Sequence, residues 1–181
     1  MKTQRIAAFA ALTAALAACT GGGLQVARDV PPAVRAPAGQ MAHLELLAVG
    51  TQVYECAADD RTPGAHAWRF RAPEAELQDR HGRPLGRHFA GPTWEALDGS
   101  AVVGEVVSKD PGPDAAAIPW LLLKAKTNRG RGTFAQTTSI QRVDTVGGMA
   151  PSQECDAARL GQVAKVPYRA TYYFFRTISP A

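Results

Sequence analysis

The stretch RHFAGPTWEALDGSAVVGEVV, residues 87–107, contains the clearest fold signals in the chain. Gly91 and Pro92 break a first extended run, and Asp98-Gly99 separates the second run from a third, apolar one. An Asp-Gly pair before an apolar run is among the strongest short-range hairpin signals, because glycine adopts positive φ angles without steric cost. The stretch therefore predicts three consecutive strands joined by tight turns, but it does not indicate a function.

The rest of the chain repeats this pattern of short extended runs between turn residues. Alternating apolar and polar positions, or β-branched and aromatic residues, predict strands at 43–49, 52–56, 67–71, 85–89, 118–126, 133–146 and 163–176. Gly50-Thr51 separates the first two of these strands, and Pro73-Glu74 is expected to end the third. With little helical periodicity, we expect a single all-β domain, an antiparallel β-sandwich or β-barrel of about eight to ten strands with little helix.

The N-terminus has the composition of an export signal. Lys2 and Arg5 precede an apolar run at residues 6–18, and this run is shorter than the ~20 residues that a membrane-spanning helix needs. Residues 16–19, LAAC, resemble the lipobox of bacterial lipoproteins; the alternative is an ordinary signal peptide with an incidental cysteine. The resemblance implies that residues 1–18 are a signal peptide that is removed.

A lipobox also implies that Cys19 becomes the first residue of the mature chain and carries acyl chains. Several acyl chains on one residue anchor a protein stably in a membrane. Thr20 follows this cysteine, where Gram-negative lipoproteins retained in the inner membrane usually have Asp. We therefore expect a cell-envelope lipoprotein, anchored in the outer membrane and facing the periplasm. Residues 19–40 are then the lipidated N-terminus and a Gly/Pro-rich tether, which either stands clear of the domain or lies along it, and residues 41–181 are the β-rich domain.

The charge balance argues against nucleic acid as a partner. The formal charge of +4 includes Lys2 and Arg5 of the signal, so the mature chain keeps 4 − 2 = +2. The sequence also lacks a run of Lys and Arg that could follow a phosphate backbone. An exported protein with so small a surplus is not expected to bind nucleic acid.

Two cysteines remain after Cys19. Cys56 and Cys155 form an even pair in an oxidising compartment, so we expect a disulfide, with two free buried thiols as the alternative. Neither has a second Cys or a His at the spacing of a zinc site. The four histidines, His43, His66, His81 and His88, also lack such a spacing. We therefore expect no metal and no cofactor.

Several short motifs extend over nearly the whole mature chain: residues 30–39, 52–56, 68–75, 88–100, 118–122, 139–148 and 166–174. Together they resemble the secreted bacterial and fungal family known as domain-of-unknown-function family 3455. The resemblance implies export and a single domain. It brings no established activity and no catalytic residues.

The central stretch holds the candidate binding residues His88, Trp94 and Glu95. A polar site with an aromatic wall suits a sugar or another small ligand, because a ring face packs on an apolar ligand face. The alternative is structural: a core Trp and an exposed Glu, with Asp98 serving its turn. Arg142 and Asp144, two positions apart in one predicted strand, are expected to share a face and to pair.

We expect a non-catalytic envelope lipoprotein domain that binds a small molecule or an envelope component, or that has a structural role. The alternative function is a secreted hydrolase acting on glycans or esters, with His88 and Glu95 as its candidate residues. Glycoside hydrolysis needs two carboxylates at a defined separation. A pocket that encloses two or more of His88, Glu95, Asp98 and Asp144 would favour the hydrolase.

Overall fold

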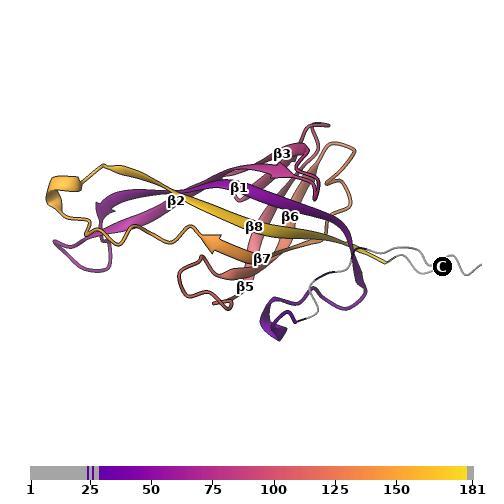
Figure 1. Ribbon diagram of the computed structural model, residues 1–181, viewed down its shortest axis with the longest axis horizontal. Coiled ribbons are helices and arrows are strands. Elements are labelled where there is room, and N and C mark those ends of the chain that lie inside the picture. The colour runs from indigo at the N-terminus through magenta and orange to yellow at the C-terminus, as the bar shows by residue number, and fades with distance from the viewer. Residues whose placement is uncertain (1–23, 25, 27–28, 179–181) are drawn as a thin grey trace, which may run out of the picture.

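The computed structural model describes residues 24, 26 and 29–178 (Figure 1). The expected signal peptide, residues 1–18, and the expected lipidation site, Cys19, lie outside the described residues. Within the described part of the chain, none of the helices has the length and apolar composition that crossing a lipid bilayer requires.

The domain is all-β, as predicted, and its strands close into a barrel rather than a sandwich. Each strand pairs antiparallel with the next along the chain, and the last strand pairs with the first. The strands are β1 (Gln40–Ala58), β2 (His66–Gln78), β3 (Pro84–Phe89), β4 (Thr93–Ala96), β5 (Ala101–Asp110), β6 (Trp120–Arg129), β7 (Ser139–Gly147) and β8 (Val163–Thr177). Two short 3-10 helices, η1 (Pro32–Val34) and η2 (Ala157–Arg159), complete the described fold.

Two expected strand ends are wrong. β1 continues through Gly50, because this glycine lets two strands approach closely: a Cβ there would lie 2.1 Å from the carbonyl oxygen of Glu74. β2 continues through Pro73, because β2 begins to pair with β3 only at Ala75 and proline is tolerated on such an edge. As a result β1, β2 and β8 run on beyond the barrel as a three-stranded extension toward η2 (Figure 1).

One cluster of buried hydrophobic side chains fills the barrel interior. Inward-facing side chains alternate with outward-facing ones along each strand, as the pleat requires. In β8 the residues Tyr168, Ala170, Tyr172 and Phe174 face the interior, whereas Tyr173 and Phe175 belong to a second cluster outside it. Phe134, from the loop between β6 and β7, is fully buried in the interior cluster.

Part of the expected tether packs on the outer wall of the barrel. Val34 of η1 is fully buried, and its carbonyl oxygen accepts a hydrogen bond of 2.6 Å from Nε2 of Gln141 in β7. The hydroxyl of Ser108 donates to the carbonyl oxygen of Ala33. Val30 and Val34 thereby cover the outward-facing cluster that includes Trp120. The packed structure therefore begins before β1.

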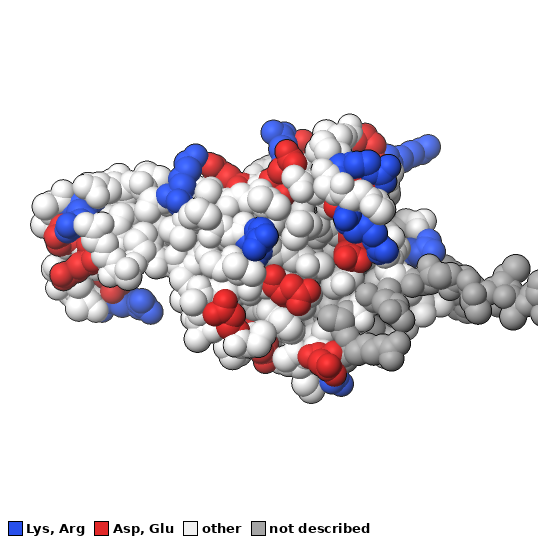
Figure 2. Space-filling model, in the orientation of Figure 1, with Lys and Arg blue, Asp and Glu red and all other residues white. Residues whose placement is uncertain are grey.

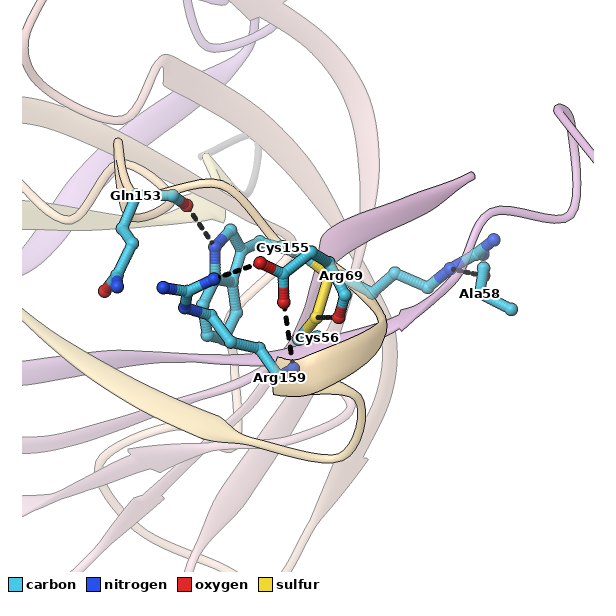
Figure 3. Close-up of a disulfide and its surroundings, with 8 residues drawn as sticks. Cys56, Ala58, Arg69, Gln153, Cys155 and Arg159 are labelled. Carbon is cyan, nitrogen blue, oxygen red and sulfur yellow. Dashed lines mark hydrogen bonds and ion pairs between the residues drawn. A yellow bond between two sulfur atoms is a disulfide. The ribbon is translucent and has the colours of Figure 1, made fainter. Parts of the chain in front are cut away.

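Cys56 and Cys155 form the expected disulfide (Figure 3). Cys56 lies in the part of β1 that extends beyond the barrel, and Cys155 lies in the loop before η2. Next to the bridge, the indole Nε1 of Trp68 donates a hydrogen bond of 2.7 Å to the carbonyl oxygen of Gln153. The bridge closes a loop with a sequence separation of 99 and ties the extension to the start of β8.

Candidate functional site

A cavity of about 310 Å³ opens at the end of the barrel where a turn joins β3 to β4. Gly91 and Pro92 of this turn border it, and Phe70 and Val106 form an exposed apolar rim. Its inner wall is apolar and aromatic, and polar groups are few. The wall includes Gln52, His88, Trp94, Leu123, Arg142 and Tyr172.

His88 and Trp94 face each other across the β3–β4 ladder and point into this cavity. Opposing residues of an antiparallel pair lie on the same face of the sheet, so their side chains meet. Their rings stack nearly parallel, with centroids 4.4 Å apart and an interplanar angle of 9°. Tyr172 of β8 contacts both rings edge-on, at 5.2 and 5.3 Å between centroids. The three rings form one aromatic wall.

The protonation state of His88 is set by its surroundings. Its Nδ1 lies 2.8 Å from the carbonyl oxygen of Thr93, and because a carbonyl can only accept, Nδ1 carries the proton. Burial lowers the pKa of His88 to about 3; the hydrogen bond to Thr93 opposes this shift, and the positive charge of Arg142 adds to it. The imidazole is therefore neutral near pH 7, and its Nε2 has a free lone pair.

Two other wall residues have buried polar atoms without a partner. Neither Nε2 of Gln52 nor Nε1 of Trp94 makes a hydrogen bond within the described structure. Gln52 is 2% exposed and Trp94 is 1% exposed. A buried donor without an acceptor costs about 1–3 kcal/mol, so such groups in a native protein are usually satisfied by water or a ligand. Both residues that carry these donors line the cavity.

Arg142 of β7 brings a positive charge to the same cavity. Its Nε and Nη2 donate to the carbonyl oxygen of Pro119, at 3.1 and 2.7 Å, which fixes the guanidinium in place. Among the described residues it forms no ion pair within 4.0 Å. The expected pairing with Asp144 is wrong, because a bulge between Val143 and Val146 interrupts the strand and Asp144 has a φ of 50°.

The three candidate binding residues do not come together. Glu95 follows Trp94 in β4 and therefore points to the other side of the sheet. There its carboxylate pairs with Arg87 at 2.7 Å and with Arg129 at 2.9 Å. His88 and Trp94 thus line the cavity, and Glu95 lies on the outer face.

The carboxylates expected near the candidate site also lie elsewhere. Asp98 accepts hydrogen bonds from Ser100 and from Thr133, and these bonds hold the pKa of its carboxyl well below the usual range. Asp144 is exposed. Among the described residues that line the cavity there is no Asp or Glu. The acid pair that glycoside hydrolysis requires is therefore not assembled around His88.

Gln52, Arg142 and Tyr172 are wall residues that the sequence analysis did not identify. Strand alternation could have indicated two of them, because residues two positions apart in a strand face the same side. Arg142 therefore shares a face with Ile140, and Tyr172 shares a face with Phe174. Both partners are fully buried core residues.

On the face shown in Figure 2, Lys and Arg side chains are interspersed with Asp and Glu, so charge of one sign does not dominate this face. Nor do three His, Cys, Asp or Glu side chains gather as a metal site in the described ranges.

Comparison with known proteins gives a family but no activity. The family model described as "Protein of unknown function (DUF3455)" matches residues 37–176. Among curated proteins and solved structures, none matches the chain at a significant level. The family match includes the strands that build the cavity.

Proposed function

We propose a ligand-binding function for this chain, which belongs to the family of proteins of unknown function DUF3455. The barrel holds one small, largely apolar molecule in the cavity beside the β3–β4 turn, without chemical conversion. Barrels of eight strands are just wide enough either to fill with side chains or to hold one small ligand. Here a cluster of side chains fills the interior and borders a cavity of about 310 Å³.

The observation that carries the proposal is the combination of an aromatic wall with unpaired polar atoms. The rings of His88, Trp94 and Tyr172 supply apolar contact, while Gln52 Nε2 and Trp94 Nε1 lack acceptors within the described structure. Small-molecule sites typically combine a mostly apolar lining with a few placed polar groups.

We further propose that the protein is an outer-membrane lipoprotein anchored through Cys19. The N-terminal signal supports export, and a disulfide persists in an oxidising compartment such as the periplasm. Leu24 lies beside Asp79 and Arg80, near the turn between β2 and β3. Because β3 runs from that turn to the β3–β4 turn, the cavity mouth is at the end of the barrel remote from Leu24.

Binding is tested with the neutral fluorescent probe N-phenyl-1-naphthylamine, which brightens in apolar surroundings. The blocking variant is Val106→Trp, because Val106 is 51% exposed at the rim and a larger side chain there fills the mouth without entering the core. Val107→Trp is the matched control, since Val107 is 58% exposed and does not line the cavity.

We expect saturable brightening with the wild type and with Val107→Trp, and an affinity reduced roughly tenfold or more in Val106→Trp. Absence of saturable binding to the wild type, or equal binding by the two tryptophan variants, would refute the proposed function.

A further inference from the structure

Two arginines, Arg71 and Arg142, and no acidic residue line the cavity among the described residues. Arg142 has five N–H donors, of which two are used by the carbonyl oxygen of Pro119. Arg71 also borders the cavity, but it pairs with Glu55 at 2.8 Å. The charge of Arg71 is therefore compensated by a carboxylate, whereas Arg142 has no ion pair among the described residues.

The charge of Arg142 acts across the cavity. It lowers the pKa of groups on three other strands, Tyr54 of β1, His88 of β3 and Tyr172 of β8, although burial is the larger influence on each of them. A guanidinium in a partly water-excluded site is costly unless an anion or hydrogen-bond acceptors compensate it. Within the described structure, the guanidinium donates to the carbonyl oxygen of Pro119 and interacts with the hydroxyl of Tyr172, and no carboxylate pairs with it.

Two of the buried polar groups near Arg142 are hydrogen-bond donors, whereas the neutral Nε2 of His88 can accept. Gln52 Nε2 and Trp94 Nε1 are buried donors without acceptors in the described residues, so they favour a guest that brings acceptor oxygens. A cationic guest would be repelled by Arg142 and would find no carboxylate on this wall. The remaining surface, formed by Trp94, Leu123 and Tyr172, is suited to an apolar body.

We propose that the ligand is a small amphipathic acid whose deprotonated acidic group pairs with Arg142 and whose apolar body lies against Trp94 and Leu123. This inference rests on the proposed binding function and names the ligand class. The volume of about 310 Å³ lies at the lower end of the range of small-molecule sites, roughly 300–1,000 Å³, and favours one or two fused rings over a long chain.

The test compares 2-naphthoate with its neutral amide, 2-naphthamide, by isothermal titration calorimetry. The two compounds have the same apolar body and differ in the charge of one group. We expect the wild type to bind the acid roughly tenfold or more tightly than the amide, because charge-assisted hydrogen bonds to Arg are about twice as strong as neutral ones. In Arg142→Gln this preference should disappear, so that the acid and the amide bind with about equal affinity.

Three controls keep the result interpretable. Arg142→Lys keeps the charge and should retain part of the preference for the acid. Arg87→Gln makes the same charge change on the outer face, beside the cavity residue His88, and should retain all of it. Binding of N-phenyl-1-naphthylamine by Arg142→Gln shows that the cavity is still formed.

Equal binding of acid and amide by the wild type would overturn the inference, as would an acid preference that persists in Arg142→Gln. Binding of neither compound would also overturn it. In each of these cases, retained binding of N-phenyl-1-naphthylamine would leave the proposed function standing. Loss of both the naphthyl pair and the neutral probe would refute the function itself.

Discussion

The imidazole of His88 and the indole of Trp94 stack at 4.4 Å between centroids, although each belongs to a different strand. The stack exists because the two residues are directly opposed in the β3–β4 ladder. It holds a neutral histidine beside a buried indole, and both rings face the cavity. This cross-strand pair therefore forms part of the aromatic wall of the proposed site.

The buried His88 should make stability depend on pH. Its pKa is about 3 in the folded protein and 6.5 when exposed, so the unfolded state binds more protons between these values. The contribution of neutral His88 to stability is therefore fully present above pH 6.5 and decreases as the pH falls toward 3. When the pH is lowered from about 7 to about 5, the titration of His88 should reduce the free energy of unfolding by about 2 kcal/mol.

His88→Asn removes this titration and can still donate to the carbonyl oxygen of Thr93. Urea unfolding of the wild type and the variant at both pH values isolates the contribution of His88, because all other titratable groups are present in both proteins. A loss of stability on acidification that is equal in the two proteins would contradict the assignment of a buried, neutral His88.

The disulfide should be a major source of stability. Replacing both Cys56 and Cys155 by Ala frees a loop with a sequence separation of 99, and loss of a native bridge typically costs about 2–5 kcal/mol. Urea unfolding measures this cost, and the wild type in reducing agent should unfold at nearly the same midpoint as the double variant. An unchanged midpoint in both would show that the bridge does not constrain the chain.

Gly50→Ala should disrupt the pairing of β1 with β2. The new Cβ would lie 2.1 Å from the carbonyl oxygen of Glu74 and 2.5 Å from the Cα of Ala75, so the backbone itself must move. We expect a loss of about 3 kcal/mol or more in unfolding free energy, at the upper end for overpacking. Stability within about 0.5 kcal/mol of the wild type would mean that the strands do not approach so closely.

The segment before β1 should contribute to the fold. A chain that begins at residue 37 lacks Val30 and Val34, which are buried against the outer wall, whereas a chain that begins at residue 29 keeps them. Burying two valines is worth about 3 kcal/mol before ordering costs. Thermal unfolding should show the shorter chain to be clearly less stable, and equal midpoints would show that the segment only rests on the barrel.

Local signals predicted the turns better than they predicted the extent of the strands. Asp79 and Asp98 each accept a hydrogen bond from a backbone N–H two residues further on, and such turns depend on adjacent residues alone. Gly50 is different, since its role depends on Glu74 in another strand. A strand that needs a glycine for close approach looks, in sequence, like two strands separated by a turn.

The cavity was predictable only in part. His88 and Trp94 are close in sequence and meet through one hairpin, so the sequence identified both. Alternation would have separated Glu95 from Trp94, because consecutive strand residues face opposite sides. Gln52 and Arg142 belong to β1 and β7, and no local pattern shows that barrel closure brings them to one wall.

The most direct measurement of the central claim is the response of the three tryptophan indole N–H signals in nuclear magnetic resonance spectra during titration with N-phenyl-1-naphthylamine. Trp94 lines the cavity, Trp68 donates to Gln153 beside the disulfide, and Trp120 packs under the N-terminal segment. A ligand in the cavity should shift the Trp94 signal and leave those of Trp68 and Trp120 in place. Shifts at Trp68 or Trp120 with an unmoved Trp94 signal would contradict a binding site in the barrel.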